Sequence, residues 1–341
     1  MEKVLSIIIP TYNMSQYIER CLNSLLSSAT KDKLDIIVVN DGSKDDSSEK
    51  AKHVALSYPD TIRVIDKPNG NYGSCINTGL KLAIGKYIKI LDADDQFDTS
   101  SLEKVIDLIE HVDVDLVLTD FKRNYEQAQT ELVSFPLTPK KILTFTEICS
   151  IKEFKNLWMH SVMYKAALFH QIDYYQTEGI SYTDQEWIFS PLAVVRKVYY
   201  IPEALYLYTL GREGQTVSES YMKRNFAQHV ICIKSMINSF NQLPTDTPKA
   251  IKQMLYSRLF NLVRFVYKGY LIKRYKDKKG TLRDFDAFIE TSLPKLHKDI
   301  AKLKLSKPVM PYHYIKHWQK NPRSRVLHYM INLYIWKKRL F

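Results

Sequence analysis

Short apolar runs alternate with amphipathic stretches over the first 120 residues, and this alternation restricts the fold of the 341-residue chain more than any other feature. Apolar residues recur at helical spacing between the runs, as from Tyr17 to Leu26. The runs predict buried strands at Val4–Ile9, Ile36–Asn40, Ile62–Asp66, Tyr87–Leu91 and Leu116–Thr119. This alternation is typical of parallel βαβ units, so we predict an α/β domain with a mostly parallel central sheet and helices on both faces.

Polar motifs follow the first two of these strands. Ligands of parallel sheets bind beyond the carboxyl ends of the strands, so these positions are candidate binding residues. Pro10 lacks an N–H and is expected to end the first strand, before Thr11, Tyr12 and Asn13. The second strand leads into Asn40–Ser43, where Asp41 could accept a hydrogen bond from a base N–H. Each motif alone also fits an ordinary turn.

Three carboxylates in four residues follow the fourth strand, at Asp92, Asp94 and Asp95, with Ala93 between the first two. Such carboxylates repel one another unless a cation or protons offset their charge. If the strand continued, alternation would put Asp92 and Asp94 on one side, one facing a ribose and the other a metal. Oxygen ligands suit Mg²⁺ or Mn²⁺. An acidic turn before a helix is the alternative, but the position at a strand end favours a metal site.

Four motifs stand in order at these strand ends: Ser6–Asn13, Val38–Ser43, Asn77–Ile88 and Leu91–Asp95. Together they resemble the nucleotide-sugar domain of family 2 glycosyltransferases, closely over the first 120 residues and extending to residue 218. The resemblance implies a glycosyltransferase A fold and an inverting, metal-dependent transfer from a nucleotide-activated sugar. Many relatives carry Arg before the Asn of the glycine-rich segment, whereas Ile76 precedes Asn77 here.

The resemblance also assigns roles by motif position. Thr11 and Asp41 would contact the base, Asp92 would lie near the ribose or donor sugar, and Asp94 would hold Mn²⁺ or Mg²⁺ between the phosphates. The donor-binding set that we predict is Pro10, Thr11, Tyr12, Asn13, Asp41, Asn77, Asp92, Ala93, Arg212 and Thr216. In this set, Arg212 lies between Gly211 and Gly214 and is similar to the basic loop that closes over the donor in relatives, although a surface turn is the alternative.

Inversion requires a group that takes the proton of the acceptor hydroxyl, and a carboxylate can do this. The stretch from Gly179 to Phe189 is similar to the family's acidic motif before a helix, which makes Asp184 the expected base. Thr183 and Glu186 also fit a capping box, and the two interpretations are compatible. His160 and Asp95 are predicted acceptor-site residues, although a lone His beside apolar neighbours also fits a structural role.

Charge divides the chain near residue 218. Residues 1–218 hold 23 Lys/Arg and 30 Asp/Glu, a net of −7, and residues 219–341 hold 26 and 7, a net of +19, which add to the +12 of the chain. Apolar residues from Ile251 to Val266 recur at helical spacing. We therefore predict a nucleotide-sugar-binding catalytic domain over 1–218 and a basic, aromatic-rich helical domain over 219–341.

Three interpretations of the basic domain remain: a solvated face, a nucleic-acid surface, or a surface for an anionic membrane or polyanionic acceptor. No nucleic-acid motif is recognisable, and the grouping of aromatic and basic residues favours the membrane. No signal peptide or 18-residue apolar stretch is recognisable, and the four cysteines are isolated, which predicts a cytoplasmic protein with reduced thiols. We expect peripheral association with the inner face of the cell membrane and allow for a homo-oligomer.

The sequence thus predicts a glycosyltransferase that moves a sugar, from UDP in our expectation, to a hydroxyl of a cell-surface glycan, teichoic-type polymer or lipid-linked acceptor. The alternative is a non-catalytic nucleotide- or polymer-binding module on the same fold, which the intact Asp92, Asp94 and Asp184 disfavour. A dinucleotide-dependent dehydrogenase is disfavoured because the first strand lacks a G-x-G-x-x-G turn.

Overall fold

A computed structural model of the chain describes residues 2–125, 129–211, 215–216, 218–277, 280–305 and 310–338. The chain forms two compact units. One is Met1–Gln215 with Asp246–Met254, and the other is Thr216–Thr245 with Leu255–Phe341. The predicted division of functions at residue 218 stays a prediction.

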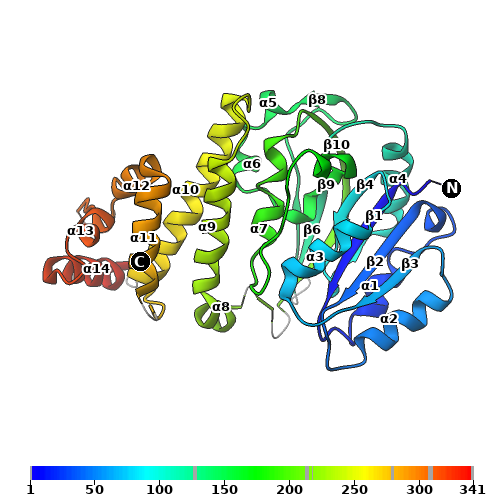
Figure 1. The fold of residues 1–341 in the computed structure, drawn as a ribbon, viewed down its shortest axis with the longest axis horizontal. Helices are drawn as coiled ribbons and strands as arrows, with labels where there is room; N and C mark the ends of the chain where they lie inside the picture. The colour runs from blue at the N-terminus through cyan, green and yellow to red at the C-terminus, as the bar shows by residue number, and fades with distance from the viewer. Residues whose placement is uncertain are drawn as a thin grey trace. The chain divides into compact units, whose positions relative to one another are not determined.

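The first unit is an α/β domain (Figure 1). Its strands are β1 Leu5–Thr11, β2 Leu34–Asn40, β3 Ile62–Asp66, β4 Tyr87–Ile90, β5 Gln96–Phe97, β6 Leu116–Tyr125, β7 Thr130–Val133, β8 Ile142–Thr144, β9 Val162–Lys165 and β10 Lys197–Leu210. Its helices are α1 Ile18–Asn23, α2 Ser47–Leu56, α3 Asn71–Leu82, α4 Thr99–Glu110, α5 Phe145–Ile148, α6 Lys152–Lys155 and α7 Asp184–Trp187. Short 3₁₀ helices are η1 Lys31–Lys33, η2 Met159–Ser161, η3 Ala166–His170 and η4 Pro191–Ala193.

The strands of the described residues form one sheet in the order β3-β2-β1-β4-β9-β6-β10-β5, with β7 beside β6 and β8 beside β10. Strands β1 to β4 run parallel to one another, and β6 and β10 form a second parallel pair. Strand β9 lies antiparallel between β4 and β6, so these two groups point the same way and the sheet is mostly parallel, as predicted. The carboxyl ends of β1, β2 and β4 therefore meet at one edge.

All five predicted strands are present, and their ends differ by a few residues. The prediction that Pro10 ends the first strand is wrong, because β1 continues to Thr11. The backbone N–H and C=O groups of successive residues in β1 point to opposite neighbouring strands. Those of Thr11 face β2, where the Thr11 carbonyl accepts from the Asp41 N–H, so those of Pro10 face β4. Since β4 pairs with β1 only as far as Ile90, the missing N–H of Pro10 leaves no gap in the ladder.

Helices cover both faces of the sheet, as predicted. On one face, side chains of β1 and β2 join those of α1 and α4 in one buried apolar cluster that includes Ile7, Ile9 and Val38. On the other face, α3 packs against β1, where a Cβ on Gly79 would lie 2.5 Å from a methyl carbon of Ile8. Only glycine therefore allows α3 to approach β1 this closely.

The spacing of Ser100 and Glu103 fits a capping box that would start a helix at Ser101, but α4 begins at Thr99, two residues earlier. Asp98 is its N-cap and accepts a hydrogen bond from the Ser101 N–H at 2.8 Å. A cap at Ser100, which the Ser100–Glu103 spacing suggests, would require non-helical backbone at a position that is already helical.

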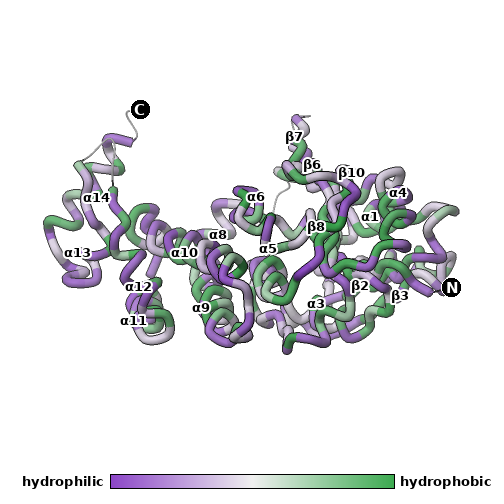
Figure 2. The backbone as a smooth tube through the Cα atoms, turned by 90° about the horizontal axis from the view of Figure 1, so that it is seen from above, coloured by the Kyte–Doolittle hydropathy of each residue, from purple (hydrophilic) through white to green (hydrophobic). Residues whose placement is uncertain are grey.

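The second unit is mainly helical. Its helices are α8 Glu219–Asn225, α9 Ala227–Asn241, the larger part of α10 Lys249–Leu271, α11 Thr281–Ser292, α12 Pro294–Ala301, α13 Tyr314–Lys320 and α14 Arg325–Lys338. Hydrophobic and hydrophilic residues alternate along these helices (Figure 2), which is typical of amphipathic helices around a small core. Among the residues described, no helix has the length and apolar composition that a membrane span requires.

Candidate active site

The loops that follow β1 and β2 are joined at the carboxyl edge of the sheet. The Asn13 N–H donates to Ser43 Oγ at 3.0 Å, and the Lys44 N–H donates to Asn13 Oδ1 at 2.8 Å. Asn13 has a φ of 54°, a left-handed conformation that Asn tolerates better than most residues. Thr11 is buried and Tyr12 is exposed. The structure thus brings the predicted donor-binding residues of these two loops together.

Asp41 is buried and surrounded by donors. Lys67 Nζ lies 2.7 Å from Asp41 Oδ1, and the N–H groups of Gly70 and Asn71 each donate to its carboxylate at 2.9 Å. These N–H groups lie at the start of α3, where the helix dipole also favours a negative charge. Asp41 is therefore a compensated carboxylate that links β2 to α3.

The acidic run after β4 is a turn rather than a continued strand. β4 ends at Ile90, and the Asp95 N–H donates to the Asp92 carbonyl at 3.0 Å. Arg20 Nη2 donates to the carbonyl of Asp94 at 2.9 Å. The expectation that strand alternation orients Asp92 and Asp94 is therefore wrong, because the chain turns before Asp94.

Tyrosine hydroxyls hold two of these carboxylates. Tyr72 Oη donates to Asp92 Oδ1 at 2.9 Å, and Tyr206 Oη donates to Asp95 Oδ2 at 2.8 Å. The other oxygen of Asp95 accepts from the Thr209 N–H at 2.7 Å. The Asp92 N–H in turn donates to the Tyr206 hydroxyl at 3.1 Å, so one side chain of β10 binds both ends of the turn.

The acidic turn places one buried carboxylate, that of Asp95, beside the half-buried carboxylates of Asp92 and Asp94. Burial, followed by the charges of Asp94 and Asp92, raises the pKa of the Asp95 carboxyl well above its usual range. Burial and these three carboxylates also raise the pKa of the Cys21 thiol. The partners of Asp95 named above are neutral donors. A bound cation would relieve this repulsion, so the donor set fits a divalent metal ion.

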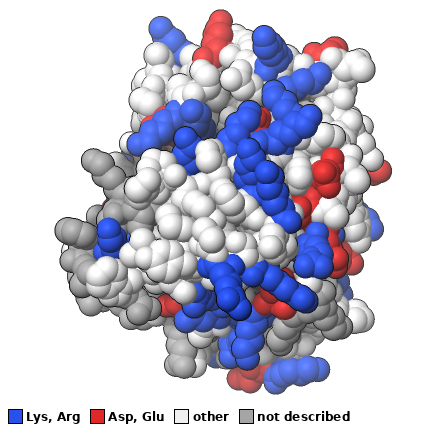
Figure 3. Space-filling model, turned by 90° about the vertical axis from the view of Figure 1, so that its left-hand side faces the viewer, with Lys and Arg blue, Asp and Glu red and all other residues white. Residues whose placement is uncertain are grey.

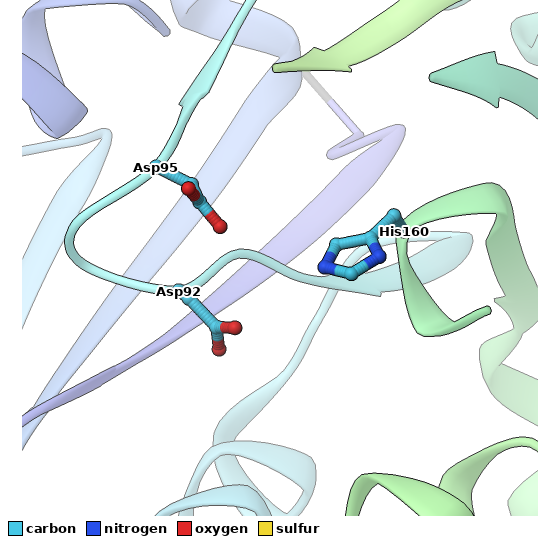
Figure 4. A group of neighbouring side chains, drawn as sticks. All are labelled: Asp92, Asp95 and His160. Atoms are coloured by element: carbon cyan, nitrogen blue, oxygen red, sulfur yellow. The ribbon is translucent and has the colours of Figure 1, made fainter. Parts of the chain in front are cut away.

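His160 faces this turn from η2. One ligand atom each of Asp92, Asp95 and His160 lie within 4.8 Å of one another (Figure 4). The imidazole stacks on the Tyr208 ring with a centroid distance of 4.3 Å, and its buried Nδ1 has no hydrogen-bond partner. Burial, together with the positive charges of Lys89 and Arg123, lowers the pKa of His160 to about 3. The ring is therefore neutral near pH 7 and could serve as a metal ligand.

Lys89 lies beneath His160 with its side chain fully buried on β4. Its Nζ donates to the His160 carbonyl at 2.8 Å and lies 5.8 Å from the centre of the Tyr206 ring. Burial lowers the pKa of Lys89 to about 7. Lys89 carries no signal in the sequence, because a lysine inside a strand pattern is indistinguishable from an exposed one until the sheet is formed.

Asp184 is the first residue of α7. Its charge, after burial and the charge of Asp92, raises the pKa of the Tyr72 hydroxyl, and it also contributes to the raised pKa of Tyr208. The charge of the predicted base therefore affects the pKa of the same two tyrosines as the acidic turn does, although 92 residues separate Asp184 from Asp92 in the sequence. The structure brings these carboxylates to one region.

The predicted capping box at α7 is not formed. Thr183 makes no side-chain cap, and its hydroxyl instead accepts from Gln176 Nε2 at 3.0 Å. Glu186 is buried and accepts from the N–H and hydroxyl of Thr177, each at 2.7 Å. The loop that contains Gln176 and Thr177 forms hydrogen bonds with both side chains, because the buried polar groups of this loop need partners.

Asn77 holds this same loop against α3. Its side-chain nitrogen donates to the Gln176 carbonyl at 2.9 Å and to Glu178 Oε1 at 3.0 Å, and its oxygen accepts from the Gln176 N–H at 2.9 Å. A Cβ on Gly73 would lie 2.1 Å from the Thr177 carbonyl oxygen, so glycine permits the approach. In this geometry Asn77 positions the segment that carries Asp184, and a donor contact by Asn77 stays a prediction.

The remaining predicted residues differ in how much the structure says about them. Ala93 is buried in the acidic turn, and Ile76 is buried in the core, so no cation stands at the position of the family arginine. Arg212 lies outside the described residues. Thr216 is exposed and belongs to the second unit. Two functional tyrosines were not expected, Tyr72 and Tyr206. For Tyr206 the pattern Tyr206-Leu207-Tyr208 in β10 is a sequence signal, and Tyr72 has none.

The family model and the related sequences all indicate the same family of proteins. The family model described as glycosyl transferase family 2 matches residues 6–169. An uncharacterized glycosyltransferase of Mycoplasma genitalium is 32% identical over 228 residues, which cover 64% of this chain and 72% of that protein. The uncharacterized glycosyltransferase EpsJ of Bacillus subtilis is 32% identical over 216 residues, and the chain spans 61% of its length.

Solved structures share the fold. S. aureus TarS 1-349 has a TM-score of 0.69 and 20% sequence identity, covering 97% of this chain and 89% of that one. TarS has also been solved in complex with UDP-GlcNAc and with UDP. The mannosyltransferase PcManGT of Pyrobaculum calidifontis, in complex with GDP-Man and Mn²⁺, has a TM-score of 0.52 at 17% identity and covers 98% of this chain and 88% of that one. These likenesses confirm the predicted glycosyltransferase A fold.

Proposed function

Because the chain belongs to glycosyltransferase family 2 and is a glycosyltransferase, we propose that it transfers a sugar from a UDP-linked donor, with inversion, to a hydroxyl of a cell-surface glycan, teichoic-type polymer or lipid-linked acceptor. One geometric observation carries the proposal: α3 joins the two acidic segments, because its Tyr72 hydroxyl donates to Asp92 Oδ1 at 2.9 Å and its Asn77 holds the loop that leads to Asp184. The complexes of TarS with UDP-GlcNAc and UDP support the choice of nucleotide.

The donor site is assigned to the carboxyl edge of the sheet. The loops of Thr11–Asn13 and Asp41–Ser43 would hold the nucleoside, with Asp41 accepting from the base. Asp92 would face the ribose or donor sugar, oriented by the Tyr72 hydroxyl. These residues lie on strand ends and on the start of α3, so the sheet itself sets their spacing.

We assign a divalent cation to Asp94. Asp95, whose two oxygens accept hydrogen bonds from Tyr206 and Thr209, would hold the turn that carries Asp94. PcManGT was solved with Mn²⁺, which supports this class of ion. A divalent cation, when bound, neutralises the charge of the departing diphosphate.

Asp184 would accept the proton of the acceptor hydroxyl as that oxygen attacks the anomeric carbon on the face opposite the diphosphate. Gln185 Nε2 donates to Asp184 Oδ2 at 3.0 Å and would orient its carboxylate. Asn77 and Glu186 hold the loop and the helix on either side of Asp184, so its position depends on α3 as well as on α7. His160, stacked on Tyr208, would line the acceptor side.

A donor screen by thermal shift tests the proposal. With Mn²⁺ present, UDP-sugars should raise the melting temperature, because a ligand that binds only the native state stabilises it. GDP-mannose and a nicotinamide dinucleotide serve as controls from other donor classes. A rise with UDP-sugars alone supports the assignment, and an equal rise with GDP-mannose overturns the choice of nucleotide. The absence of any rise, with or without metal, contradicts nucleotide-sugar binding.

The predicted location, cytoplasmic and at the inner face of the cell membrane, is a separate proposal. It depends on the basic second unit and not on the donor site. A homo-oligomer through the C-terminal helices remains a proposal that size-exclusion chromatography with light scattering would test.

A further inference from the structure

The end of the chain carries many cations and no acid. Residues 300–341 contain no Asp or Glu, so their net charge is +10. Their cations are Lys302, Lys304, Lys307, Lys316, Lys320, Arg323, Arg325, Lys337, Lys338 and Arg339. Among those that the structure describes, Lys302 has an ion-pair partner, Asp299. A surface with this imbalance attracts a polyanion or an anionic membrane.

Helix α14 presents two opposite faces. Leu327 and Ile331 are buried within the second unit. Val326, Tyr329 and Trp336 are exposed by 62%, 64% and 58%. With the half-buried Leu333 these residues are spaced three, four and three positions apart, which places them along one stripe of the helix, opposite the buried pair.

Cations flank this stripe. At 100° per residue, Arg325 lies beside Trp336 on one edge of the stripe, and Lys337 lies beside Val326 on the other. Figure 3 views the side of the molecule where α12 to α14 lie in Figure 1, and it shows uncharged surface between groups of Lys and Arg. Aromatic and aliphatic side chains between cations are typical of a helix that lies in a membrane interface.

We propose that the exposed stripe of α14, defined as Val326, Tyr329, Leu333 and Trp336, inserts into the interface of an anionic lipid bilayer, with Arg325 and Lys337 contacting the headgroups. A soluble polyanion would account for the cations, but it would not account for three large apolar side chains exposed on the same face. The proposal extends the expected membrane association to one helix face. It does not rest on the assignments of donor, metal or base, which lie in the other unit.

Flotation of the full chain with vesicles tests the proposal. Vesicles of equal parts phosphatidylglycerol and phosphatidylcholine should carry the protein upward at low salt, whereas pure phosphatidylcholine vesicles should carry little. Changing both Tyr329 and Trp336 to Ser should lower the partition constant at least tenfold. Neutralising Arg325 and Lys337 to Gln should lower it about fivefold for each charge. Trp336→Phe should also remove the blue shift of tryptophan fluorescence that vesicles produce.

Matched changes in the first unit serve as controls. Leu56 is 79% exposed on α2, and Leu56→Ser should leave flotation unchanged. Lys152→Gln with Lys155→Gln removes two exposed charges from α6 and should also have no effect. Circular dichroism and an unchanged thermal shift with UDP would establish that each variant is folded and that its donor site is intact.

Two outcomes would overturn the proposal. One is the absence of flotation with anionic vesicles at low salt. The other is flotation that depends on Arg325 and Lys337 but is unchanged by the Tyr329 and Trp336 substitutions, and that soluble polyphosphate abolishes. That second result would indicate a surface for a polyanionic polymer rather than for a bilayer.

Discussion

Asp41 and Asp95 are both buried carboxylates that follow strands of the same sheet, but their surroundings differ. Asp41 accepts from a lysine and from two N–H groups at the start of α3. Asp95 accepts from a tyrosine and one N–H group, while Asp92 and Asp94 add negative charge beside it. The comparison teaches that burial alone does not decide the role of a carboxylate. A buried carboxylate whose charge is offset by donors, such as Asp41, connects a strand to a helix. A buried carboxylate beside other carboxylates, such as Asp95, favours the binding of a cation nearby.

The largest expected effect concerns Asp184, whose charge acts on the same tyrosines as the acidic turn and not on the surroundings of Asp41. Asp184→Asn should lower the turnover number roughly 10³-fold, because an amide cannot accept the proton of the acceptor hydroxyl. The dissociation constant for UDP, measured by calorimetry, should stay within about twofold. Asp173→Asn, at an exposed position, is the control. Full activity of Asp184→Asn at saturating donor would show that another group is the base.

The next largest effect concerns the metal ion, and it tests whether the acidic turn and Asp41 differ in function. Asp94→Asn should lower activity roughly 10²-fold and raise the Mn²⁺ concentration that gives half-maximal activity, because it removes the assigned ligand. Asp41→Asn should leave that concentration unchanged while lowering the free energy of unfolding by about 3 kcal/mol, since Lys67 loses its charged partner and keeps the neutral Pro68 carbonyl and Ser74 hydroxyl. If His160→Gln raises the Mn²⁺ requirement and Asp94→Asn does not, the cation belongs to the group of Asp92, Asp95 and His160.

The effect that is smallest per unit of the measured variable concerns the pH dependence caused by the buried cation beneath the acidic turn. Lys89 has a pKa of about 7 in the folded chain and an ordinary value near 10.5 when unfolded. Between these values the unfolded chain binds the additional proton. The free energy of unfolding should therefore rise with pH there, by at most about 1.4 kcal/mol per pH unit, and this contribution should be lost as the pH falls toward 7.

Lys89→Met should remove this part of the pH dependence in urea unfolding measured from pH 7 to pH 10. Lys81→Met, at an exposed position of α3, should keep the wild-type slope. Parallel curves for Lys89→Met and the wild type would indicate that Lys89 stays protonated in the folded chain.

Much of the fold followed from local pattern. Each predicted strand lies in the sheet, and the mostly parallel order and the helical second unit were expected. The errors concern strand ends and helix caps, which depend on which donor pairs with which acceptor in the folded chain. Pro10 does not end β1, Ser100 does not cap α4, and Thr183 does not cap α7, because β2, Asp98 and Gln176 provide the relevant contacts instead.

Periodicity and motif order determined the family, the class of fold and the carboxylates worth attention, because strand and helix patterns and strand-end motifs are encoded over a few neighbouring residues. Only the folded chain decided that Tyr72 and Tyr206 hold Asp92 and Asp95, and that Asn77 fixes the loop leading to Asp184. Those contacts join residues that lie far apart along the chain. They arise when packing removes polar groups from water, and each group then takes whichever partner the surrounding elements bring within reach.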